Sequence, residues 1–142
     1  FDGLIIAKAA MERLNLSFEN TYEFSYEEML PAASQGFIGI ECISSNKDLI
    51  KMLDSINSEK DMILAEAERS FVAQLNGSCL SPIAIYCREE SSHVLISAKA
   101  LSQNGDKQIF KEIISSHASI NEDIRSLAKE FISKGADKLI LS

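Results

Sequence analysis

Hydrophobic and polar residues alternate most regularly in the C-terminal half of the chain. Three stretches rich in β-branched and apolar residues predict strands over residues 83–87, 94–101 and 108–114. Asn104 and Gly105, which separate the last two stretches, are the residue pair typical of a tight hairpin turn. The pattern therefore predicts a small antiparallel three-stranded sheet.

Two longer helices with apolar faces are predicted beside this sheet. The first begins at residues 58–61, and helical spacing places on one face Ala65, Ala67, Phe71, Val72 and Leu75. We expect it to end at Asn76 and Gly77, because glycine tolerates the left-handed conformation of a helix cap.

The second helix follows a capping-box sequence at residues 119–122 and ends at Gly135. Its predicted apolar face consists of Ile120, Ile124, Leu127, Ala128, Phe131 and Ile132. The chain is then expected to finish as an extended segment over residues 138–141. The predicted fold class is α+β, with helices on one face of the antiparallel sheet.

The N-terminal part contains shorter and less regular runs. Residues 4–7 are continuously apolar, which is typical of a buried parallel strand, and a helix over residues 9–14 is expected to follow. Residues 15–29 have no clear period and predict a loop. After Pro31 and a turn, residues 37–42 read as a strand, and residues 44–53 predict a short helix.

Composition narrows the class of protein. The chain has 142 residues, 46% of them hydrophobic, which suffices for one modest core or parts of two. The net charge of −7 without a basic cluster argues against nucleic acid or an anionic membrane as partner. No apolar run approaches the ~20 residues needed to span a bilayer. Cys42, Cys79 and Cys87 lack metal-site spacing, so we expect no metal and a reducing, cytoplasmic location.

Cys79 is the main candidate for a reactive residue, since it lies at a reachable position on a loop between a helix end and a strand start. The negative end of the helix dipole would oppose a thiolate there, and neither His93 nor His117 has a motif that ties it to this cysteine. Two interpretations stay open. Cys79 is either an inert buried residue of a non-enzymatic interaction module, or a thiol that meets a strong electrophile. Cys42 and Cys87, in strand-like runs, are expected to be core thiols.

Two stretches, LPAASQGFIGIEC at residues 30–42 and AERSFVAQLNGSCLSPI at residues 67–83, together resemble the porphobilinogen deaminase (hydroxymethylbilane synthase) family. That family usually reads LPAxGQGAxGIE and AERxxxxxLxGGCxxPI. The resemblance extends from FDGLIIA at residues 1–7 to GAD at residues 135–137 and so covers essentially the whole chain. The sequence departs from the family pattern at Ser34, Phe37 and Ser78, where the family usually has Gly, Ala and Gly.

The resemblance implies that the chain is the C-terminal portion of the enzyme, in agreement with the absence of an initiator methionine. Residues 1–30 would close the second α/β domain, residues 31–45 would cross to a strand of the first, and residues 46–142 would form the cofactor-attachment domain. The family's catalytic aspartate would lie upstream, so no catalytic residue is assigned and the fragment is expected to be inactive alone. The intact enzyme is expected to be a monomer, whereas exposed half-domain surfaces around Leu4 and Ile38 would make the fragment self-associate.

The implied activity is that of a transferase of haem biosynthesis. It would join four porphobilinogen molecules with release of ammonia, on a dipyrromethane cofactor bound through a thioether to Cys79. Loss of ammonia leaves an azafulvene, which is reactive enough for an ordinary thiol. The growing polypyrrole chain would be the second partner of the protein.

The resemblance also assigns two binding sites. Arg13 matches an arginine that binds pyrrole carboxylates, which a guanidinium can hold with paired hydrogen bonds. From the residues alone, an ion pair with Glu12 or Asp2 is the alternative. Gln35 and Gly36 would line the cleft and contact the cofactor, and the alternative for them is an ordinary turn.

Overall fold

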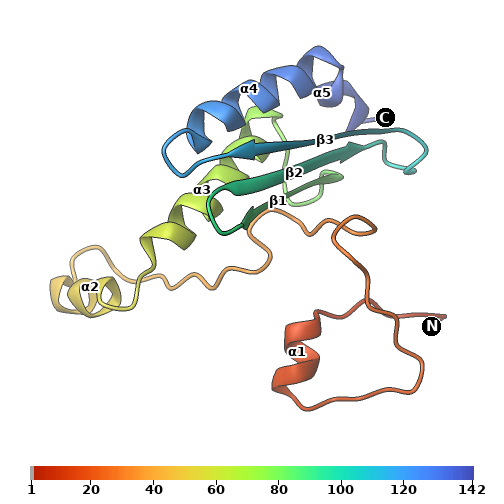
Figure 1. The fold of residues 1–142 in the computed structure, drawn as a ribbon. Coiled ribbons are helices and arrows are strands. Elements are labelled where there is room, and N and C mark those ends of the chain that lie inside the picture. The colour runs from red at the N-terminus through yellow and green to blue at the C-terminus, as the bar shows by residue number, and fades with distance from the viewer. Residues whose placement is uncertain (1) are drawn as a thin grey trace.

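The structure is a computed structural model that describes residues 2–142, so that Phe1, the first residue of the FDGLIIA stretch, lies outside the described residues. Figure 1 shows a sheet with helices packed over one side and an N-terminal part that extends away from it. The elements are α1 (Lys8–Arg13), α2 (Lys47–Asp54), α3 (Glu59–Gln74), β1 (Ile83–Glu89), β2 (Val94–Leu101), β3 (Gln108–Ser115), α4 (Ile120–Ser133) and α5 (Ala136–Leu139).

The three strands form one antiparallel sheet in the order β1-β2-β3, which confirms the predicted meander. Ile85 lies opposite Ala98, and Ile96 lies opposite Ile113. The hairpin turn between β2 and β3 has Gly105 at φ 77°, a left-handed conformation that a residue without Cβ adopts at no steric cost. The predicted strand limits agree with the structure to within two residues.

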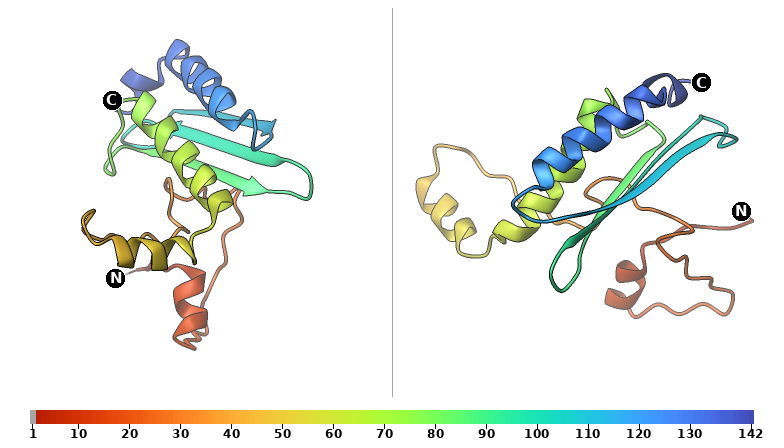
Figure 2. Two further views of the ribbon diagram at one scale, coloured as in Figure 1. Left: turned by 90° about the vertical axis from the view of Figure 1, so that its left-hand side faces the viewer. Right: turned by 45° about the horizontal axis from the view of Figure 1, so that its top comes forward.

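Helices α3 and α4 cover one face of the sheet (Figures 1 and 2), which confirms the α+β class. Alternate side chains of β1 and β2 are buried on this face, as a period of two requires. Phe71 of α3 and Phe131 of α4 meet edge to face with ring centroids 5.1 Å apart and are fully buried. The buried core lies entirely between Leu64 and Ile140.

The two strands expected in the N-terminal part are not formed, since residues 4–7 and 37–42 have no regular structure. Leu4 is 79% exposed and Ile38 is 81% exposed. A strand needs a neighbour for its backbone N–H and C=O groups, and the single sheet of the described residues is β1-β2-β3. The prediction of strands over residues 4–7 and 37–42 is therefore wrong for this chain. Helices α1 and α2 were predicted correctly.

Three details of the helix ends differ from the predictions. Ser119 makes no side-chain cap on α4, and instead its own backbone N–H donates to the Ser116 hydroxyl at 3.2 Å. The left-handed residue after α3 is Asn76, at φ 54°, rather than Gly77. Residues 138–141 are not extended, because the chain turns at Gly135 (φ 82°) into the short helix α5.

Candidate functional site

The loop between α3 and β1 presents Cys79 to solvent. The cysteine follows the left-handed Asn76 and precedes Pro82, whose fixed geometry leads into β1. Cys79 is exposed, Cys42 is partly buried and Cys87 is buried in the core. The interpretation of Cys79 as an inert buried residue is therefore wrong, as is the expectation that Cys42 belongs to the core. The prediction for Cys87 is confirmed.

Two serines hold the backbone of this loop on either side of the thiol. The Ser78 N–H donates to the Ser81 hydroxyl at 2.9 Å, and the Ser78 hydroxyl accepts from Leu80 N at 3.2 Å. The Ser81 N–H in turn donates to the Ser78 carbonyl at 3.1 Å. Ser78, where the family usually has glycine, thus adds a side-chain bond that closes the turn around Cys79.

A glycine is required at position 77 because there is no room for a side chain. A Cβ at this position would lie 2.5 Å from Ile83 Cδ1 and 3.0 Å from Val72 Cγ1. The Gly77 N–H donates to the Val72 carbonyl at 3.0 Å, so the backbone passes directly over the end of α3. The glycine lets the thiol loop pack closely against the helix and the start of β1.

The second predicted site, Gln35 and Gly36, forms an exposed turn over residues 33–36. Ser34 has φ 62°, a left-handed conformation that favours the glycine usual in the family. Its hydroxyl donates to the Ala65 carbonyl at 3.2 Å, and its backbone N–H donates to Glu68 Oε2 at 2.6 Å. These two bonds tie the turn to α3 and hold Ser34 in its strained conformation.

Glu68 is the residue that the sequence analysis missed. Its side chain is 1% exposed, and its second oxygen accepts from Cys87 N at 2.8 Å. Burial raises the pKa of this carboxyl, while the hydrogen bonds from the Cys87 and Ser34 backbones lower it. The signal was present, because Glu68 takes a buried position between Leu64 and Phe71 at helical spacing.

Arg13 lies at the end of α1, which stands apart from the sheet and from α3 and α4 in every view (Figures 1 and 2). Arg13 is exposed, and among residues 2–142 it forms no ion pair with Glu12 or Asp2. The ion pair on this helix is Lys8 with Glu23, at 2.5 Å. The structure therefore places Arg13 away from the Cys79 loop, and the alternative of a surface ion pair is wrong.

The other polar residues considered do not form a second catalytic or metal-binding cluster among the described residues. His117 is half-buried, with its Nε2 3.4 Å from Glu89 Oε1. Glu66 and Arg69, three residues apart on α3, form no ion pair within the described part of the chain. The described residues include no cluster of three potential metal-ligating side chains. None of the helices described has the length and apolar character to span a membrane.

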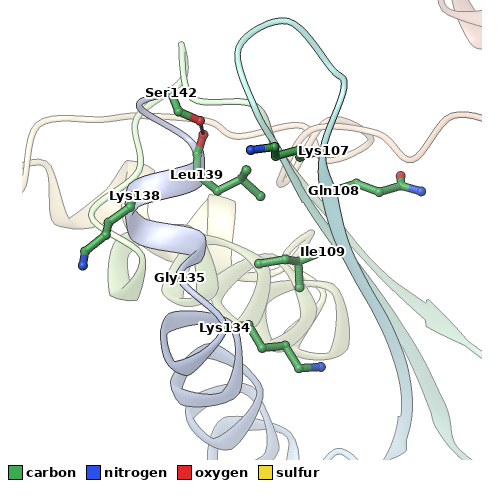
Figure 3. A pocket seen from close by; sticks show the side chains of 8 residues that line it. All are labelled: Lys107, Gln108, Ile109, Lys134, Gly135, Lys138, Leu139 and Ser142. Atoms are coloured by element: carbon green, nitrogen blue, oxygen red, sulfur yellow. Dashed lines mark hydrogen bonds between the residues drawn. The ribbon is translucent and has the colours of Figure 1, made fainter.

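A hollow of about 390 Å³ lies between β3 and α5. Its lining includes Lys107, Lys134 and Lys138 beside Ile109 and Leu139. Figure 3 shows the Lys134 and Lys138 side chains extending in different directions, so their ammonium groups do not converge. Cys79, Gln35, Gly36 and Arg13 do not line this hollow.

Comparisons with known proteins give one consistent result. Residues 1–51 match the family model "Porphobilinogen deaminase, dipyromethane cofactor binding domain", and residues 62–133 match "Porphobilinogen deaminase, C-terminal domain". Curated relatives named porphobilinogen deaminase include those of Campylobacter hominis and Campylobacter jejuni, each 37% identical over 142 residues. The relative from Listeria monocytogenes is 38% identical over 144 residues. Each alignment covers 99% of this chain and 46% of the relative, so the chain spans about half the length of the curated relatives it matches.

Proposed function

This chain belongs to the porphobilinogen deaminase family, and we propose that it carries the cofactor-attachment cysteine of a hydroxymethylbilane synthase. The whole protein would join four porphobilinogen molecules head to tail, with release of ammonia, in the biosynthesis of tetrapyrroles such as haem. The activity is assigned to the whole protein, because the chain spans about half the length of its relatives. No catalytic residue is assigned within the chain, which is expected to be inactive alone for the same reason.

The observation that carries the proposal is the exposed thiol of Cys79 on a loop that its own serines hold in place. Such a thiol can take a covalent substituent without displacing core side chains. The other two cysteines are poorer anchors, since Cys42 is partly buried and burial strongly raises the pKa of the Cys87 thiol. Cys79 is the residue expected to hold the dipyrromethane.

The attachment chemistry needs little activation of the sulfur. Loss of ammonia from the aminomethyl arm of porphobilinogen leaves an azafulvene, whose exocyclic methylene carbon is electrophilic. The Cys79 sulfur attacks such a carbon, a carbon–sulfur bond forms, and the thiol proton passes to the pyrrole nitrogen. When bound, the dipyrromethane supplies the pyrrole terminus to which further units are joined. A covalent anchor on Cys79 also keeps this terminus at the site between additions.

The proposed binding residues lie on two other segments. Gln35 offers a side-chain amide and Gly36 a backbone N–H on an exposed turn, and both would contact the pyrrole chain. Arg13, exposed and outside the ion pairs of the described residues, would bind a substrate carboxylate through paired hydrogen bonds. We assign residues 1–30 and 31–45 to two α/β domains that the whole protein completes, and residues 46–142 to the cofactor-attachment domain.

The direct test is Cys79→Ala in the full-length protein. The variant should lack the added pyrrole mass that intact mass spectrometry finds on the wild-type protein, while Cys42→Ala should retain it. Because Cys79 is exposed, its replacement should change the free energy of unfolding by less than about 0.5 kcal/mol. A Cys79→Ala protein that still carries the pyrrole mass would refute the assignment.

The whole protein is further proposed to be a cytoplasmic monomer, and the 142-residue chain to self-associate. Three free cysteines suit a reducing compartment. Exposed Leu4, Ile5 and Ile38 support association of the isolated chain. Light scattering should give the monomer mass for the whole protein and a mass that rises with concentration for the chain. A monomer mass for the chain at every concentration would refute the second part.

A further inference from the structure

Glu68 joins three segments that are distant in the sequence. It lies on α3, its Oε2 accepts from the backbone of Ser34, and its Oε1 accepts from the backbone of Cys87 in β1. β1 is an edge strand, and the Cys87 N–H points to its free side, where an unpaired donor would otherwise be exposed to other chains. We propose that Glu68 is a positioning residue, which holds the turn with Gln35 and Gly36 against the domain that carries Cys79.

An ionised carboxylate suits this position because both of its partners are donors. It accepts from Ser34 and Cys87 at once, whereas an amide of the same size presents one oxygen and one NH₂ group and can accept only one of the two bonds. Glu68 forms no ion pair among the described residues, so these two N–H groups are its compensation for burial. Burying a charge without an ion-pair partner carries a desolvation penalty that lowers the net stability. We therefore infer that Glu68 serves to position the backbone of the turn rather than to stabilise the fold.

The bond from Ser34 to this carboxylate adds to the packing that positions the turn. Ala33 and Phe37 pack against the core on either side of the turn, while Gln35 and Gly36 stay exposed. Ser34 is held between them in a left-handed conformation with its N–H directed at Glu68. The bond therefore fixes the backbone one residue before the proposed cleft residues. This inference rests on the proposed function, because it gives Gln35 and Gly36 a task only if they contact the pyrrole chain.

The first test measures the proposed bonds directly in the 142-residue chain. In Glu68→Gln, amide hydrogen exchange at Ser34 or Cys87 should become about 10- to 100-fold faster, as loss of a bond to a charged group predicts. Exchange of Ile96 in β2 should stay at its wild-type rate. Glu66→Gln, an exposed carboxylate on the same helix, is the matched control and should leave all three amides unchanged.

A second variant separates the backbone bond from the hydroxyl bond. Ser34→Gly removes the bond from the hydroxyl to Ala65 but keeps the N–H and suits φ 62°, so exchange at residue 34 should remain slow. The proposal is overturned if Glu68→Gln leaves Ser34 and Cys87 protected. It is also overturned if the variant speeds exchange of Ile96 by the same factor, since that result means general destabilisation.

The second test uses the full-length protein. Glu68→Gln should retain the pyrrole mass on Cys79 but raise KM for porphobilinogen at least about threefold relative to Glu66→Gln, because the cleft turn is no longer fixed. An unchanged KM with faster exchange at Ser34 would overturn the positioning role and leave the proposed function intact. Normal pyrrole loading of Cys79→Ala would refute the function and leave the hydrogen bonds of Glu68 standing.

Discussion

Residues 2–57 and residues 58–142 contain similar apolar runs but use them differently. In the second region, helices and strands bury their apolar faces against each other, and the whole core comes from it. In the first region, Leu4, Ile5, Ile38 and Ile40 are mostly exposed, and the apolar runs form no strand within the described residues. An apolar run alone is thus not sufficient for a strand, because the neighbouring strand decides whether it forms.

The largest expected difference in the free energy of unfolding is between two phenylalanine replacements, one in each region. Phe71→Ala removes a fully buried ring from between α3 and α4 and should lower the free energy of unfolding by about 3–5 kcal/mol. Phe18→Ala, at a half-exposed ring of the first region, should cost less than about 1 kcal/mol. Urea unfolding of the whole chain measures both. Equal losses would show that the two regions are packed alike, contrary to the comparison.

The next largest difference in stability is expected between two glycine replacements, Gly77→Ala and Gly39→Ala. In Gly77→Ala the new methyl group meets Ile83 and Val72, and overpacking of this kind costs about 1–3 kcal/mol. Gly39→Ala meets nothing within 4 Å and should leave stability unchanged or raise it by up to about 1 kcal/mol. Unfolding midpoints in urea test the pair. A destabilised Gly39→Ala would mean that the first region is packed more closely than described.

Sequence patterns predicted the second region well because its elements are partners of one another. Periods of two and 3.6, together with Gly105 and Gly135 at the turns, were enough for three strands and two helices. In the first region the same reasoning gave strands at residues 4–7 and 37–42, since a pattern within a segment carries no information about its neighbour. α5 was missed because four residues are too few to show a helical period.

The candidate site was predicted unevenly for a related reason. Motif resemblance proposed Cys79, Gln35, Gly36 and Arg13 as site residues, and the structure adds that the Cys79 thiol is exposed. Glu68 was overlooked because a charged residue is normally assigned to the solvent side of a helix. Its helical spacing with Leu64 and Phe71 showed otherwise, but its partners are backbone groups far along the chain, which no sequence pattern reveals.

The pH dependence of the free energy of unfolding should test whether the buried Glu68, which joins the two regions, has a raised pKa in the folded chain. Burial raises its pKa in the folded chain above the ordinary value of 4.5, so the folded state binds the proton more tightly than the unfolded state. The stabilising contribution of this difference is complete below pH 4.5 and is lost as pH rises through the folded-state pKa.

Glu68→Gln cannot titrate at this position. The free energy of unfolding of the wild-type chain minus that of Glu68→Gln should therefore fall as pH rises from 4.5 towards neutrality. Chemical unfolding at a series of pH values measures this difference, and Glu66→Gln, at an exposed carboxylate of the same helix, is measured in parallel for comparison. A difference that rises with pH would show that the two backbone bonds outweigh burial and that the pKa is lowered.

The smallest effect concerns the second contact between the regions. Tyr26, from the first region, stacks on Tyr86 of β1 with ring centroids 4.6 Å apart, and Arg88 lies 5.9 Å from the Tyr26 ring centroid. Tyr26→Ala should cost about 0.5–1.5 kcal/mol beyond the lost buried area and speed amide exchange around residues 26–30. Phe18→Ala, at a half-exposed ring without an aromatic partner among the described residues, is the control and should leave amide exchange in residues 26–30 unchanged. If neither variant changes exchange in residues 26–30, the stack does not fasten the first region to the sheet, and Glu68 with the packing of Ala33 and Phe37 remains the junction.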